Sequence, residues 1–150
     1  MPEITTSLEI DAPQALVWSV VSNPQRFADW NTLHSSWGEE PPAQLAKGTR
    51  LVDVVKIKGI VDRIEFTTDD VRDPGFVSLS GKGSTGSSVV LEFTVDDHAA
   101  DRSLVTLHIV FTSSVLFGPL GKVVERAFRK EFNASLEKLD HVVTGERPRG

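Results

Sequence analysis

No cysteine occurs among the 150 residues of the chain. Disulfide bonds, thiolate metal sites and a cysteine nucleophile are therefore excluded, and the absence is compatible with a reducing cytoplasm. The opening residues, MPEITTSLEI, lack the charged and then apolar pattern of a signal peptide. No apolar run approaches the ~20 residues that a membrane span needs. We therefore expect a cytoplasmic protein without a membrane span.

Basic residues are scarce as well. Lys and Arg together number 16 against 21 Asp and Glu, which gives a net charge of −5. Binding to nucleic acid usually needs a clustered basic surface, so the charge argues against nucleic acid as a partner. The apolar fraction of 39% and the charged fraction of 25% are ordinary for a globular protein. The length predicts one domain over residues 1–150, with 145–150 as a flexible tail.

Alternation of apolar and polar side chains predicts a strand over residues 4–10, because a period of two is typical of a half-buried strand. Similar patterns predict strands over 51–57, 60–68, 76–80, 89–95 and 104–111. Short turns such as Asp73-Pro74-Gly75 separate them, so the sheet should be mostly antiparallel. Residues 31–48, with two prolines and Gly48, are interpreted as a loop.

Two short helices are expected after the first strand. Asp11 can cap the first of them, and Pro13 is tolerated in its first turn. Asn23-Pro24 ends this helix and starts a second helical turn that ends near Trp30.

A long helix is expected over residues 119–144, with Gly145 as its end. Its apolar residues recur at three- and four-residue steps and form one continuous stripe: Phe117, Leu120, Val124, Phe128, Phe132, Leu136, Leu139 and Val143. A sheet with one apolar face needs a cover, and this helix can supply it. The fold class is therefore α+β, with an antiparallel sheet of about six strands against a long C-terminal helix. Because the stripe is needed internally, a monomer is expected.

This order of elements resembles the START-like superfamily of polyketide cyclases and lipid-transfer proteins, also called the helix-grip fold. The segment SLEIDAPQALVWSVVSNPQRFADW is similar to the opening of that family. Three motifs resemble its actinobacterial polyketide-cyclase-like branch: Trp30-x3-His34-x2-Trp37, Lys47-Gly48-Thr49 and Phe117-Gly-Pro-Leu-Gly121. The resemblance implies a curved sheet that grips the last helix around a cavity for an apolar molecule. Some members of the branch are labelled as toxins of type II toxin–antitoxin pairs, which implies an antitoxin as a partner.

The apolar side chains of the sheet and the long helix are the first candidate site. They are expected to converge on a ligand-binding wall made of Ile64, Phe66, Phe93, Leu107, Phe111, Val124, Phe128 and Phe132. The alternative is an ordinary closed core. Residues two or four apart in a strand share a face, which groups Ile64 with Phe66 and Leu107 with Phe111.

A second candidate site combines Trp30, His34 and Trp37 as the mouth of the pocket. His34 could transfer protons near neutral pH. The alternative is a loop held in place by two buried tryptophans, with His34 as a hydrogen-bonding partner.

Asp62 is a third candidate, because it shares the face of Ile64 and Phe66. Inside the cavity it could serve as a ligand anchor or a general base. The alternative is that Asp62 is solvated at the end of the hairpin.

Other chemistries are not supported by the sequence. Residues Gly81 to Gly86 fit the G-x-G-x-x-G pattern, but strand alternation follows them, whereas a dinucleotide site needs a helix there. The four histidines have no metal-ligand spacing, and no serine lies in a G-x-S-x-G motif. We therefore expect no metal, no cofactor and no covalent catalysis. His108 should face away from the side that Leu107 and Ile109 share.

Three functions follow as hypotheses. The first is binding of a small hydrophobic molecule, lipid-like or polyketide-like, without catalysis. The second is a cyclase or dehydratase that uses His34, Asp62 or another acid–base group in the cavity. The third is a growth-inhibiting toxin that acts through a partner.

Overall fold

The structure is a computed structural model that describes residues 3–57, 59–84, 86–99, 101–112 and 119–146. Its elements follow in this order: β1 (Glu3–Ile10), α1 (Gln14–Val21), the 3-10 turn η1 (Pro24–Arg26), α2 (Phe27–Trp30), β2 (His34–Trp37), β3 (Arg50–Ile57), β4 (Ile60–Arg72), β5 (Phe76–Gly83), β6 (Ser88–Ala99), β7 (Arg102–Thr112) and α3 (Pro119–Glu146). The α+β class, the antiparallel sheet and the long C-terminal helix are confirmed.

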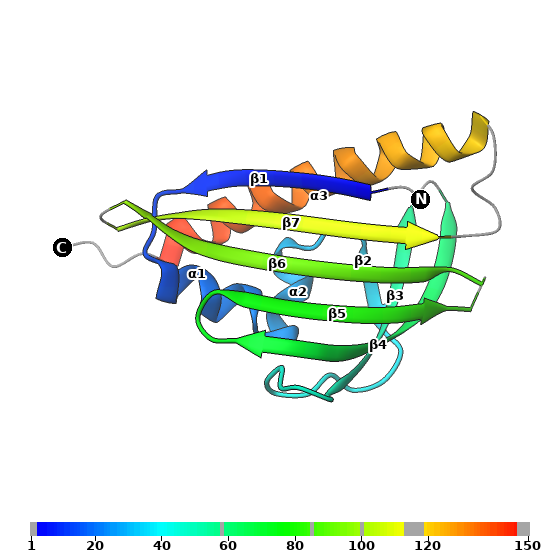
Figure 1. Cartoon of the computed structure of the whole chain (residues 1–150), viewed down its shortest axis with the longest axis horizontal. Coiled ribbons are helices and arrows are strands. Elements are labelled where there is room, and N and C mark those ends of the chain that lie inside the picture. The colour runs from blue at the N-terminus through cyan, green and yellow to red at the C-terminus, as the bar shows by residue number, and fades with distance from the viewer. Residues whose placement is uncertain (1–2, 58, 85, 100, 113–118, 147–150) are drawn as a thin grey trace.

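The strands form one seven-stranded antiparallel sheet in the order β1-β7-β6-β5-β4-β3-β2 (Figure 1). From β2 to β7 every strand pairs with its neighbour in sequence. The exception is β1, which pairs along its whole length with β7, so that Ile4 lies opposite Ile109. The first and last strands of the chain therefore lie side by side, and α3 packs against β1.

The prediction of about six strands missed β2, which lies inside the segment interpreted as a loop. β2 pairs with β3, with Trp37 opposite Asp53. Its sequence, His-Ser-Ser-Trp, is short and lacks apolar alternation. A register irregularity between His34 and Ser36 disturbs the pattern further. Pairing with β3, which is remote in sequence, makes this segment a strand.

Several strands run beyond their predicted ends. β4 continues to Arg72, and β6 to Ala99. The pairing shifts register between Thr68 and Asp70, and again between Asp97 and Ala99. In β4 the irregularity directly follows Thr68, where the predicted strand ends. In β6 the residues beyond the predicted end, 96–99, are all exposed and show no apolar alternation. Bulges also bend the strands that carry them.

The start of α1 differs from the prediction. Pro13 occupies the cap position and no side chain caps the helix, so the capping role assigned to Asp11 is wrong. Gln14 instead uses its amide Nε2 to donate to the carbonyl oxygen of Val95 on β6, at 2.8 Å. The predicted break is confirmed, because the Asn23 side chain accepts from the amide of Gln25 and η1 and α2 follow.

The long helix α3 begins at Pro119, as predicted, and continues to Glu146, so Gly145 does not end it. The carboxylate of Glu146 accepts two hydrogen bonds from the guanidinium of Arg26, at 3.0 and 2.6 Å. This bidentate pair ties the end of α3 to the helical segment before α2. Residues 145 and 146 therefore belong to the helix, and the rest of the predicted flexible tail lies outside the described residues.

The helices lie on one side of the sheet (Figure 1). α3 packs against β1 and α2, and α1 packs against β6. The inner face of β7 illustrates the alternation, because Val105, Leu107, Ile109 and Phe111 are buried between residues that are more exposed. No helix within the described ranges combines the length and apolar character needed to cross a membrane.

On the outer face of the sheet, His108 of β7 lies between two carboxylates, as its parity predicts. Its Nε2 lies 2.6 Å from Glu3 of β1, and its Nδ1 lies 3.1 Å from Glu92 of β6. Hydrogen bonding to Glu92, and then to Glu3, raises the pKa of His108 above its ordinary value. The contacts of protonated His108 with Glu3 and Glu92 stabilise the folded chain fully below the pKa of an unfolded histidine, about 6.5. This stabilisation is lost as the pH rises through the higher pKa of His108 in the folded state.

We predict that His108→Gln lowers the free energy of unfolding by about 0.5–1 kcal/mol at pH 5.5 and by less at pH 9. Urea unfolding at the two pH values measures the difference. His141→Gln removes an exposed histidine from α3 and is the matched control. An equal decrease in the free energy of unfolding at both pH values for His108→Gln would contradict a stabilising role of protonated His108.

Candidate functional site

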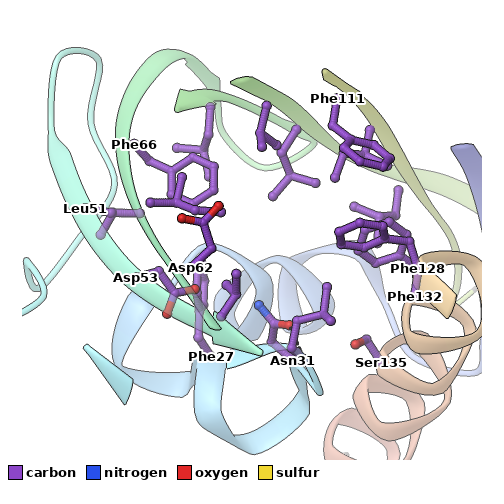
Figure 2. A pocket seen from close by; sticks show the side chains of 18 of the residues that line it. Phe27, Asn31, Leu51, Asp53, Asp62, Phe66, Phe111, Phe128, Phe132 and Ser135 are labelled. Atoms are coloured by element: carbon purple, nitrogen blue, oxygen red, sulfur yellow. Dashed lines mark hydrogen bonds between the residues drawn. The ribbon is translucent and has the colours of Figure 1, made fainter. Parts of the chain in front are cut away.

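A cavity of about 130 Å³ lies between the inner face of the sheet and the helices α2 and α3. Figure 2 shows side chains converging on it from both sides. Its walls are mostly apolar, with a small polar group of residues. The lining consists of Phe27, Trp30, Asn31, Leu33, Trp37, Leu51, Asp53, Val55, Asp62, Ile64, Phe66, Leu79, Ser87, Val89, Leu91, Phe93, Leu107, Ile109, Phe111, Phe128, Phe132 and Ser135.

One end of the cavity is aromatic. Phe111 of β7 lies edge-on to Phe128 of α3, with ring centroids 4.7 Å apart, and Phe128 stacks on Phe132 at 5.7 Å. The four-residue step between Phe128 and Phe132 puts both rings on one face of the helix. Figure 2 shows these three rings together on one side of the cavity. Trp30 packs edge-on against Phe93 of β6, at 5.5 Å.

Across the cavity, Asp62 of β4 points inward (Figure 2). Ser84 and Ser87 donate their hydroxyls to its two carboxylate oxygens, at 3.0 and 2.7 Å. Gly83 makes this arrangement possible, because a Cβ there would collide with Ser87 Oγ and the Asp62 carboxylate. The hairpin between β5 and β6 thus surrounds the carboxylate of Asp62 with hydroxyl donors.

A second carboxylate, Asp53 of β3, also lines the cavity. One of its oxygens lies 2.5 Å from Nδ1 of His34, and both side chains are almost fully buried, with 6% and 5% of their surface exposed. Burial raises the pKa of Asp53 to about 6, although His34 and the amide of Val54 oppose the shift. A carboxyl group with this pKa can exchange a proton near neutral pH.

Asn31 and Ser135 complete the polar part of the lining. Asn31 accepts a hydrogen bond from the amide of Leu33 through its oxygen, at 3.1 Å. This bond identifies its nitrogen as the end turned towards the cavity (Figure 2). Ser135 of α3 accepts from the amide of Thr32 at 3.0 Å, and its hydroxyl also lies 3.0 Å from that of Thr32.

The residues that the sequence singled out mostly come together. On the cavity wall lie Trp30, Trp37, Ile64, Phe66, Phe93, Leu107, Phe111, Phe128, Phe132 and also Asp62. His34 is not among the lining residues, and it lies instead against Asp53 and Trp37. The side chain of Val124 lies outside what the structure describes. Whether these residues contact a ligand stays a prediction.

Sequence reasoning missed the role of Asp53. A usable signal existed, because Asp53 alternates with Leu51 and Val55 and therefore shares their inward face. Its contact with His34 could not be predicted, because His34 belongs to β2, which has no strand pattern in the sequence. Phe27 was missed too, and it packs on both Trp30 and Trp37, at 5.7 and 5.6 Å.

The glycine-rich stretch, interpreted from the sequence as a hairpin connection, is partly strand. β5 runs through Gly81 to Gly83, beyond its predicted end at residue 80, and no helix follows among the described residues before β6. A Cβ at Gly81 would lie 2.7 Å from Phe66 and 2.8 Å from Ile64, so glycine here allows the cavity wall to pack. Within the described part of the chain, no three His, Asp or Glu side chains gather in a way that could hold a metal ion.

Comparison with known proteins places this geometry in a family. The family model described as "Polyketide cyclase / dehydrase and lipid transport" matches residues 1–144. The chain belongs to this family. A protein named toxin Rv0910, from Mycobacterium tuberculosis, is 29% identical over 147 residues, which cover 97% of this chain and 100% of the relative. The uncharacterized protein Rv1546 of the same organism is 26% identical over 139 residues, covering 93% of this chain and 96% of that protein.

Several solved structures share the fold. A START superfamily protein from Mycobacterium smegmatis aligns with a TM-score of 0.79 at 14% identity, over 95% of this chain and 97% of that one. The Zhui aromatase/cyclase from Streptomyces sp. R1128 aligns with a TM-score of 0.76 at 16% identity, over 95% and 93%. At these identities the likeness concerns the fold alone.

The raised pKa of Asp53 has a consequence for stability. Between its ordinary value of 3.8 and about 6, the unfolded chain releases the proton while the folded chain keeps it. Folding stability should therefore fall as the pH rises through this window, by about 3 kcal/mol for a shift of this size. We predict that Asp53→Asn removes this fall, so that the variant gains stability relative to the unmodified protein between pH 4 and pH 7.

Denaturant unfolding across that pH range measures the effect. Asp97→Asn, at an exposed position of β6, is the control for the loss of one carboxylate. Parallel stability profiles for Asp53→Asn and the unmodified protein would show that Asp53 does not titrate in this window.

Proposed function

We propose that the protein binds a small apolar molecule in the cavity between the sheet and α3. The observation that carries the proposal is the cavity itself, because its aromatic and aliphatic walls lie beside a few placed polar side chains. Binding sites for small molecules typically have this composition. Membership of a family described by polyketide cyclisation and lipid transport supports the same function.

The size of the cavity limits the ligand. At about 130 Å³ it is close to the ~150 Å³ of an engineered apolar cavity that binds benzene. A ligand that is fully enclosed in this conformation would therefore have about one ring. A longer lipid-like or polyketide-like molecule would need the walls to move apart.

Leu91 of β6 offers a way to block the cavity. Its side chain is half-buried and lines the wall, whereas the preceding residue of the same strand, Val90, points outward and is 41% exposed. We predict that Leu91→Trp abolishes binding and lowers the free energy of unfolding by about 1–3 kcal/mol, because the larger ring overpacks the wall. Val90→Trp adds the same ring to the outer face and should keep binding.

The measurement is a titration of both variants and the unmodified protein with one-ring compounds, followed by tryptophan fluorescence, since Trp30 and Trp37 line the cavity. Native mass spectrometry of the freshly purified protein complements it and reports a retained ligand. The unmodified protein should bind with a dissociation constant below about 1 mM, which corresponds to ~4 kcal/mol. Weaker binding of every compound, together with a clean apo mass, would contradict the proposed function.

A toxin role is the second candidate, and the name of the 29% identical relative favours it. In that case, expression of the chain alone should slow bacterial growth, and an antitoxin should relieve the effect. Growth curves after induction test this, with Leu91→Trp and Val90→Trp as a matched pair. If both variants inhibit growth equally, the effect does not need the cavity. An unchanged growth rate with all three proteins would remove the support for a toxin.

A further inference from the structure

The polar side chains of the cavity divide into acceptors and donors on separate elements. Two carboxylates, Asp53 and Asp62, face it from the adjacent strands β3 and β4. In the register of these strands Asp53 lies opposite Ile64 and Asp62 opposite Val55, so that the two carboxylates occupy neighbouring inward positions. Figure 2 shows both on the same side of the cavity, across from the rings of Phe111, Phe128 and Phe132.

None of the described lining residues is Lys, Arg or His. His34 lies 2.5 Å from Asp53, but it is not among the lining residues. A ligand carboxylate placed in this cavity would therefore meet two aspartates and no cationic partner. Bringing a negative charge into such a place is costly, because its desolvation is not offset by a partner and the like charges repel it.

Two residues with donor groups, Trp30 and Asn31, line the helical side of the cavity. The indole Nε1 of Trp30 is buried in a residue that is 1% exposed, and it has no hydrogen-bond partner within the part of the chain that the structure describes. A buried donor without a partner is destabilising unless a ligand supplies the acceptor. The amide nitrogen of Asn31 is a second donor on the wall (Figure 2).

A hydroxyl group is complementary to a wall that carries both hydrogen-bond acceptors and donors, because it donates one hydrogen bond and accepts others. A pure hydrocarbon offers no acceptor to the Trp30 indole or the Asn31 amide, and an ammonium group has no lone pair with which to accept from them. We propose that the cavity selects small uncharged apolar molecules that carry a hydroxyl group, alcohols or phenols, and rejects carboxylates. This inference rests on the proposed function and names the ligand class of the same cavity.

Four probes of one size test it: 2-phenylethanol, ethylbenzene, phenylacetate and 2-phenylethylamine. Each is titrated into the unmodified protein at pH 7, with tryptophan fluorescence and calorimetry as readouts. We expect 2-phenylethanol to bind at least 10-fold more tightly than phenylacetate, which the aspartates repel. It should bind at least 3-fold more tightly than ethylbenzene and 2-phenylethylamine, because neither can accept a hydrogen bond from Trp30 or Asn31. Equal or tighter binding of any of the other three would overturn the assignment of a hydroxyl ligand.

Asp62→Asn provides the second arm, because it removes one charge from the wall at constant size. The preference for 2-phenylethanol over phenylacetate should fall at least 5-fold in this variant. Glu65→Gln removes a carboxylate from the outward face of the same strand, where its side chain is 49% exposed, and should leave the preference unchanged. An unchanged preference in Asp62→Asn, or an equal fall in Glu65→Gln, would show that the Asp62 carboxylate does not set the selectivity.

The two levels of the proposal fail in different ways. If none of the four probes binds below about 1 mM, the cavity does not bind small molecules and the proposed function fails. If the probes bind and Leu91→Trp blocks them, but ethylbenzene or phenylacetate binds best, the proposed function survives and only the hydroxyl selectivity is wrong.

Discussion

The inner face of the sheet has to be covered, and the way in which it is covered decides the rest of the structure. Pairing of β1 with β7 brings the two ends of the fold together, and α3 packs along β1. α3 and α2 also contact one another, and α1 packs on β6. Between these contacts a space of about 130 Å³ is left over the middle of the sheet. The cavity is thus a consequence of covering a wide sheet with few helices.

The polar side chains in this space belong to an organised arrangement. Asp62 is held by two serine hydroxyls, for which Gly83 leaves room, and Asp53 is held by His34. Buried carboxylates are costly unless they are hydrogen bonded, so these partners make them tolerable in an apolar cavity. For Asp53 these partners do not fully offset the desolvation of the carboxylate, and its pKa is therefore raised. A closed core of the same size could use apolar side chains at both positions, and the proposed ligand would give the two carboxylates a role.

Acid–base chemistry and ligand binding use the same groups in this arrangement. A carboxyl group with a pKa near 6 could move a proton in a bound molecule, and the family includes cyclases by its description. However, His34 does not line the wall itself and lies behind Asp53 and Trp37, which do. Its contact with Asp53 holds that carboxylate in place. The geometry therefore supports selective binding more directly than a reaction.

The sequence by itself determined the elements and the grouping of side chains. Period-two alternation grouped Asp62, Ile64 and Phe66 on one face, and three- and four-residue steps put Phe128 and Phe132 on one side of α3, since these rules depend only on local backbone geometry. Tertiary structure decided which face points inward, made β2 a strand, and brought His34 to Asp53 across 19 positions of sequence. Local patterns contain no information on such pairing, because it depends on strand register and on what covers the sheet. For the same reason the sequence could indicate an apolar cavity but not the contact between Asp53 and His34 in its wall.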